Sequence, residues 1–195
     1  MRSVARKRVI QELANRISSD LPKLAKKCPV KTQYETKEYT WAVGQFWERY
    51  RRQMGPGWKL YPKNGATKGH YLVDFILFDK AYGPRIACES EWGMGSQGVA
   101  WDFEKLVGVK SDIKVLIHQC RSKKLLEYLK DAISGNALIS SNEAFLVVGF
   151  EGEKSQAHWW IPDRNGPFAI KEIDFQLLPK LTRSAFLRKN GKRAV

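Results

Sequence analysis

Apolar residues recur at helical spacing in the first part of the chain and predict two long helices. The first covers Arg6–Lys27 and ends at Cys28-Pro29, because proline cannot continue a helix. The second covers Thr36–Met54 and ends at Gly55-Pro56-Gly57. The apolar stripes consist of Val9, Leu13, Ile17, Leu21 and Leu24 in the first helix, and Tyr39, Val43, Phe46, Trp47, Tyr50 and Met54 in the second.

Beyond Gly57 the pattern changes to short β-branched and aromatic runs, which are typical of strands. Strands are predicted over Trp58–Tyr61, Tyr71–Phe78, Arg85–Trp92, Ile113–His118 and Ala144–Phe150, with weaker candidates at His158–Ile161 and Phe168–Ile173. Two further helices are predicted, over Val99–Lys110 and Ser122–Ser134.

From Thr36 onward the predicted order is α-β-β-β-α-β, followed by α-β. Three consecutive strands with short turns pair most simply as an antiparallel meander, and the β-α-β unit adds a parallel strand through a right-handed crossover. The expected fold is therefore α/β, with a mixed central sheet between helices. We assign residues 1–35 to an N-terminal helical extension, 36–178 to the core domain and 179–195 to a basic C-terminal tail.

The charge of the chain points to a polyanionic partner. There are 34 Lys and Arg residues against 20 Asp and Glu residues, which gives a formal net charge of +14. Such an excess favours nucleic acid, because neutralising phosphates releases condensed counterions. A basic surface kept for solubility, or association with ribosomes, is the alternative interpretation.

The cysteines do not suggest a disulfide framework or a zinc site. Cys28, Cys88 and Cys120 are odd in number, far apart in sequence and outside any CxxC pair. No long apolar run follows the basic start of the chain, and none approaches the ~18 residues of a membrane span. We therefore expect a cytoplasmic protein with reduced thiols and no signal peptide or membrane segment.

Three carboxylates lie within unusually apolar stretches of the sequence. Asp74 interrupts the apolar run of one predicted strand, and Glu89 and Glu91 lie two apart on the next, so these two share one strand face. Burying unpaired carboxylates is costly unless something compensates for their charge. Mg²⁺ is a natural compensating ion, because it needs few carboxylates and keeps waters that a phosphate can replace. Solvent exposure, or pairing with Lys and Arg, is the alternative for these residues.

Asp74, followed by Glu89-Ser90-Glu91 on the next strand and then by a helix and a strand, resembles the PD-(D/E)XK nuclease superfamily. The resemblance covers about residues 36–118 and depends on element order as much as on the short motif. It implies a restriction-endonuclease-like fold and phosphodiester hydrolysis, usually of DNA. It also implies that Asp74 and Glu89 bind Mg²⁺ or Mn²⁺.

The sequence departs from the motif at two positions. Val73 replaces the proline, which has no chemical role, and Glu91 replaces the lysine that orients the attacking water. Glu91 resembles the acidic residue found there in some type II restriction enzymes, and would act as an extra metal ligand or as the base. Lys105, on the following helix, is the candidate for a displaced lysine. Its helical-wheel position nearly opposite Val99, Phe103 and Leu106 predicts instead that it faces solvent or nucleic acid.

Several other residues are candidates for subsidiary roles. Glu38 and Glu48 are considered as a further metal ligand from a helix, but Glu48 lies opposite the apolar stripe and is expected to face solvent. The glycine-rich stretch 93–98 either contacts phosphate or is a simple turn, and without a Gly-Lys-Ser/Thr ending it does not predict ATP binding. The candidates for contacting nucleic acid are Arg49, Arg51, Arg52, Lys63, Lys68, His70, Arg188 and Lys189.

Two functional classes remain beside the nuclease. One is a nucleic-acid-binding protein without catalysis on the same fold, which the missing motif lysine favours. The other is a subunit of a defence, repair or mobile-element complex, whose basic surface binds an acidic protein. A homodimer is also compatible with the resemblance, because many such nucleases dimerise to cut both strands, although no segment is a clear dimerisation signal.

Overall fold

The computed structural model describes residues 3–29, 35–62, 72–93, 95–119, 123–134, 136, 139–140, 142–151 and 154–161. Within these ranges it contains a six-stranded sheet and four helices. The helices are α1 (Ser3–Ala25), α2 (Glu35–Met54), α3 (Ser96–Gly108) and α4 (Lys123–Ser134). The strands are β1 (Trp58–Tyr61), β2 (Phe75–Asp79), β3 (Gly83–Glu91), β4 (Ile113–His118), β5 (Ala144–Glu151) and β6 (Lys154–Trp160).

The strands lie in the sheet in the same order as in the sequence, β1-β2-β3-β4-β5-β6. β1, β2 and β3 pair antiparallel, β3, β4 and β5 pair parallel, and β6 is antiparallel to β5. The predicted antiparallel meander followed by a parallel β-α-β unit is therefore confirmed, as is the mixed α/β class. The helix α3 makes the connection between β3 and β4.

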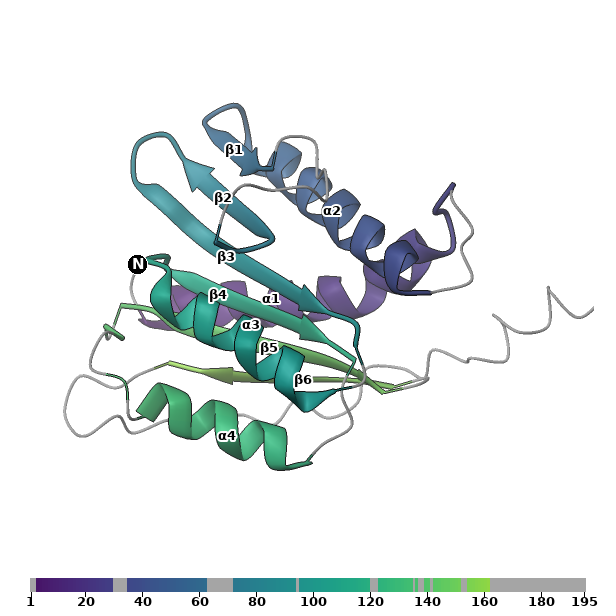
Figure 1. The fold of residues 1–195 in the computed structure, drawn as a ribbon. Helices are drawn as coiled ribbons and strands as arrows, with labels where there is room; N and C mark the ends of the chain where they lie inside the picture. Colours follow the sequence, from purple (N-terminus) through teal and green to yellow (C-terminus); the bar gives the residue numbers. More distant parts are fainter. Residues whose placement is uncertain are drawn as a thin grey trace, which may run out of the picture.

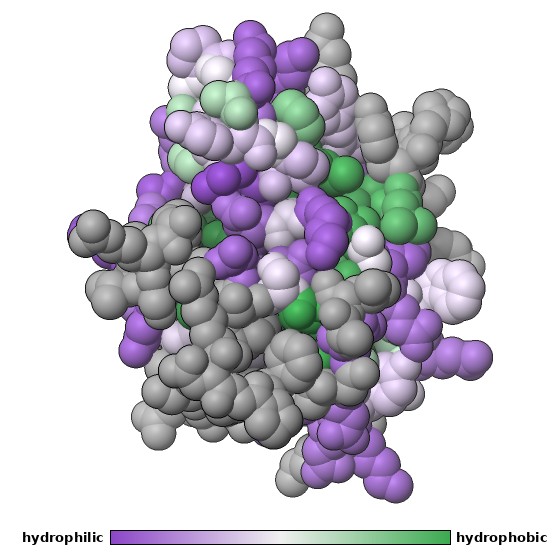
Figure 2. Space-filling model, turned by 90° about the vertical axis from the view of Figure 1, so that its left-hand side faces the viewer, coloured by the Kyte–Doolittle hydropathy of each residue, from purple (hydrophilic) through white to green (hydrophobic). Residues whose placement is uncertain are grey.

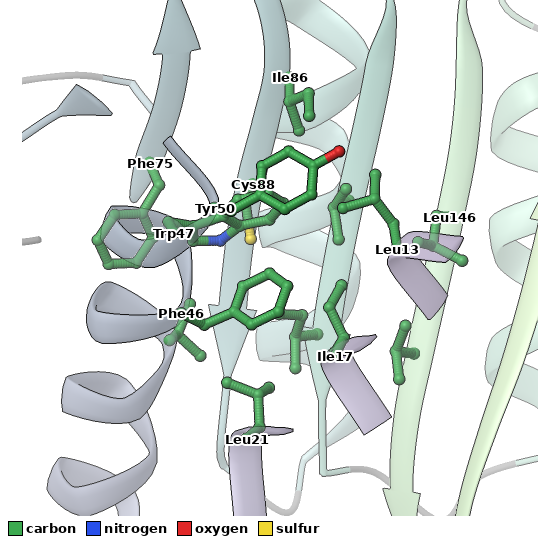
Figure 3. Close-up of a cluster of buried hydrophobic side chains, with 14 of the residues drawn as sticks. Leu13, Ile17, Leu21, Phe46, Trp47, Tyr50, Phe75, Ile86, Cys88 and Leu146 are labelled. Carbon is green, nitrogen blue, oxygen red and sulfur yellow. The ribbon is translucent and has the colours of Figure 1, made fainter. Parts of the chain in front are cut away.

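The sheet lies between two helical layers (Figure 1). The helices α1 and α2 cover one face, where Leu13, Phe46, Ile86 and Leu146 belong to one buried cluster (Figure 3). The helices α3 and α4 cover the other face, through a second cluster that includes Phe103, Leu129, Leu116 and Val147. The helix of the predicted N-terminal extension thus packs in the same core as the sheet. Each layer buries one strand face, as the alternation of side chains along a strand requires.

Apart from two strand starts, the described helices and strands begin and end within three residues of the predicted positions. The second strand begins at Phe75 rather than at Tyr71. The backbone N–H groups of Asp74 and Ser90 donate to the side-chain carboxylates of Glu89 and Asp74, respectively, instead of to the main chain of the neighbouring strand. The last described strand begins at Lys154, earlier than predicted. The strand candidate Phe168–Ile173 and the basic tail lie outside the described residues.

One face of the molecule is largely polar where its residues are described. Figure 2 shows the side that lies at the left of Figure 1, where hydrophilic residues predominate over small apolar areas. None of the helices within the described ranges has an apolar stretch long enough to cross a bilayer.

Candidate active site

Asp74 and Glu89 meet where β2 begins and β3 nears its end. Asp74 Oδ2 accepts two hydrogen bonds of 2.9 Å from Ser90, one from its backbone N–H and one from its hydroxyl. The backbone N–H of Asp74 donates to Glu89 Oε2 at 3.3 Å. Both bonds from Ser90 fall on Oδ2, so Oδ1 is the oxygen that Asp74 can offer to a cation. The two acids predicted as a pair therefore lie side by side, because each carboxyl group accepts a hydrogen bond from a backbone N–H of the other acid or of its neighbour.

The helix α3 brings Lys105 to this pair. Its ammonium lies 2.6 Å from Glu89 Oε1 and 2.7 Å from Asp102 Oδ1. The prediction that Lys105 points away from the sheet was wrong. Asp102 flanks the buried face of α3, three residues after Val99, and the long stem of Lys105 reaches back toward it along the helix.

The three side chains differ in their contact with solvent. The Glu89 side chain is only 1% exposed, while those of Asp102 and Lys105 are 13% and 26% exposed. Lys105 thus contacts the buried carboxyl group of Glu89 while part of its own side chain remains exposed to solvent. A side chain in this position is within reach of a ligand that approaches from solvent.

The cluster contains more negative than positive groups. Burial, together with the charge of Asp74, raises the pKa of Glu89 to about 8, although Lys105 opposes this shift. Burial also raises the pKa of Asp102, and the charges of Glu91 and Asp74 add to the effect. Although burial disfavours its charge, hydrogen bonds to Asp102 and Glu89 raise the pKa of Lys105. One ammonium therefore stands against four acidic side chains, an excess that would favour a further cation once Glu89 has lost its proton.

This electrostatic arrangement predicts how stability depends on pH. The carboxyl of Glu89 has a pKa of about 8 in the folded chain and about 4.5 unfolded, so the folded state binds more protons between these values. In EDTA, the free energy of unfolding should therefore fall as the pH rises through this window. Thermal unfolding should show a smaller fall for Glu89→Gln, in which this group does not titrate. An equal fall in both proteins would contradict the predicted role of Glu89.

Glu91 faces the glycine-rich loop after β3. Its Oε1 accepts a short hydrogen bond from the backbone N–H of Gly93. Its Oε2 would lie only 3.0 Å from a Cβ placed on Gly98, in the first turn of α3. The absence of a side chain at Gly98 therefore leaves room for this carboxylate near the positive end of the helix dipole. This contact favours a role for Glu91 in holding the loop, beside the two roles that the motif implies.

Substitution of Glu91 separates these roles. If Glu91 mainly holds the loop, Glu91→Gln should keep the bond from Gly93 and retain cleavage within about tenfold of the wild type, a loss of about 1.4 kcal/mol in transition-state stabilisation. If the chain cleaves DNA, as the resemblance implies, single-turnover cleavage measures this difference. A loss as large as that of Glu89→Gln would instead identify Glu91 as a metal ligand or base.

The carboxylates suit a hard divalent cation. Mg²⁺ binds through one or two carboxylates and keeps several waters, so it does not require a closed cage of protein ligands. Among the described residues, no group of three or more His, Cys, Asp and Glu side chains is placed to hold a metal ion. The donors that such an ion would meet are Asp74 Oδ1 and Glu89, with Asp102 beside them.

The arginines predicted to contact nucleic acid have different surroundings. Arg49 is exposed on α2. Arg51 and Arg52 both bond Glu48 at 2.9 Å, although the Arg52 side chain is still 71% exposed. The prediction that Glu48 faces solvent was wrong, because these two arginines cover its carboxylate. The remaining nucleic-acid candidates lie outside the described residues: Lys63, Lys68, His70, Arg188 and Lys189.

Two residues of the site were not assigned roles from the sequence. Ser90 lies between Glu89 and Glu91, where a serine carries no distinctive signal. Asp102 had a usable signal, because it is three residues before Lys105 and close to the buried positions Val99 and Leu106. An acid at the edge of an apolar helix face, next to an acidic strand, favours a shared site.

The comparisons with known proteins add no identification. No protein-family model matches this chain, and no curated protein or solved structure matches it either.

Proposed function

We propose that this chain is a divalent-metal-dependent nuclease with a restriction-endonuclease-like sheet, and that DNA is its substrate. The supporting observation is the contact between Lys105 and Glu89. In the superfamily that the sequence resembles, a lysine close to the second acid orients the attacking water, and here a lysine reaches Glu89 from α3 instead of from β3. The net charge of +14 supports a nucleic-acid substrate.

Each residue then has a distinct role. A bound Mg²⁺ would activate a water and neutralise charge on the scissile phosphate. Asp74 and Glu89 would hold the ion, and Ser90 fixes the orientation of Asp74 through its two hydrogen bonds. Lys105 orients the attacking water and stabilises the negative charge that develops on the phosphate. Asp102 keeps the ammonium of Lys105 at the site.

A plasmid assay tests this proposal. Supercoiled DNA should be nicked or linearised by the wild type in Mg²⁺ or Mn²⁺, and should remain intact in EDTA. Asp74→Ala should bind DNA but not cut it. If the wild type binds DNA in a salt-sensitive manner without cutting it in either metal, the alternative of a binding protein without catalysis is favoured instead. Stable co-purification with an acidic partner and weak DNA binding would favour the role of a complex subunit.

Trp101 is a candidate for direct contact with the substrate. Its side chain is on α3, next to Asp102 and one helical turn from Lys105, and it is 66% exposed. Stacking of a base on an exposed aromatic ring is worth about 1–3 kcal/mol. Trp101→Ala should therefore weaken binding of single-stranded DNA by about 5- to 150-fold, as measured by fluorescence anisotropy. Tyr82→Ala is the matched control, because Tyr82 is exposed on the turn before β3. Equal affinities of wild type and Trp101→Ala would exclude this contact.

A further inference from the structure

The position of Lys105 has a consequence for metal binding, which rests on the proposed metal site. Its ammonium lies within 2.7 Å of one oxygen from Glu89 and one from Asp102. These are the carboxylates next to Asp74 in a cluster with excess negative charge. The ammonium of Lys105 therefore occupies the position between these acids in which a metal ion would bind.

A divalent ion and this ammonium compete for the same carboxylate. Glu89 is almost fully buried, and its two oxygens already face Lys105 and the backbone N–H of Asp74. An ion that binds Glu89 at Oε1 replaces the lysine or shares that oxygen with it against like-charge repulsion, whereas an ion at Oε2 competes only with the 3.3 Å bond from the Asp74 backbone. The Lys105 side chain is partly exposed and flexible, and its second partner is only three residues away on the same helix.

We propose that Lys105 is a built-in occupant of the cation site, which a bound metal displaces from Glu89 toward the substrate phosphate. The ion pair between Lys105 and Asp102 persists when Glu89 binds the metal, so the ammonium stays at the site. The exchange keeps the buried carboxylate compensated when no metal is bound. It also makes the lysine available to phosphate only once the metal is present.

Mg²⁺ affinity without DNA provides the test. Isothermal titration calorimetry with MgCl₂ at one fixed pH should show at least about tenfold tighter binding by Lys105→Met than by the wild type, within the roughly 5–150-fold range common for coupled sites. Lys110→Met is the matched control, because it removes the same charge from an exposed residue outside the cluster. Its affinity should equal that of the wild type.

The other outcomes separate this inference from the proposed function. Equal Mg²⁺ affinities of wild type and Lys105→Met would overturn the exchange but leave a metal-dependent nuclease in place. Absence of Mg²⁺ binding by every variant would overturn both the exchange and the metal site.

The wild type supplies a second measurement in case Lys105→Met does not fold. Mg²⁺ should increase the rate at which Lys105 is acetylated by a soluble reagent, with Lys110 as the internal reference in the same mass spectrum. An unchanged rate at saturating Mg²⁺ would also overturn the exchange.

Discussion

Glu89→Gln should reduce Mg²⁺-dependent DNA cleavage at least about 10³-fold, because loss of a metal ligand removes several kcal/mol of transition-state stabilisation and each 1.36 kcal/mol is tenfold in rate. DNA binding should remain, since the Glu89 side chain is buried and has almost no surface to offer to DNA. Single-turnover cleavage and anisotropy measure the two effects on the same preparation.

Glu127→Gln is the control for this substitution. Glu127 is exposed on α4, outside the acidic cluster, so the same chemical change there should leave cleavage unaltered. If Glu89→Gln cleaves at the wild-type rate, Glu89 is not a metal ligand and the proposed site is wrong. If both cleavage and DNA binding are lost, a folding defect is indicated, which circular dichroism identifies.

Lys105→Met should reduce cleavage by about 10²–10³-fold, the usual cost of removing one preorganised group that stabilises developing charge. Lys105→Arg should recover only part of this loss, since the planar guanidinium keeps the charge but cannot replace the compact ammonium between Glu89 and Asp102. The rate must be measured at saturating Mg²⁺, so that a change in metal affinity does not contribute.

The control for this prediction is Lys110→Met, which loses the same charge at a side chain that is 75% exposed. Its cleavage should be close to that of the wild type. Full activity of Lys105→Met would show that the contact with Glu89 has a structural role alone. The chemistry would then need another group, for which Glu91 is the candidate.

Much of the fold was predictable from the spacing of apolar residues. The stripe of α2 as far as Tyr50 and the apolar run of β5 fall where the structure has them, because both pack in the core. Met54, the last residue predicted for that stripe, is instead 40% exposed at the end of α2. The start of β2 was not predictable, since Asp74 and Ser90 replace main-chain pairing with side-chain bonds. The alternation of apolar and polar residues along a strand does not show where side-chain hydrogen bonds take the place of main-chain ones.

The site was predictable where it lies on strands and less so where a helix contributes to it. Asp74 and Glu89 could be paired because adjacent antiparallel strands bring neighbouring positions together. Lys105 was judged from the direction of its Cα–Cβ bond, but a lysine stem spans enough distance to reach around the side of a helix. The direction of the Lys105 side chain is set by its ion pairs with Asp102 and Glu89. The pair with Glu89 forms only in the folded chain, so the helix pattern alone does not predict it.

The position of a bound Mn²⁺ tests the central claim most directly, because the ion can be located by its anomalous X-ray scattering in a crystal. We predict a peak that is coordinated by carboxylate oxygens of both Asp74 and Glu89 at about 2.1 Å. The same peak should be absent from Glu89→Gln crystals soaked under identical conditions. A peak bound by neither Asp74 nor Glu89, with no density between these two residues, would contradict the claim.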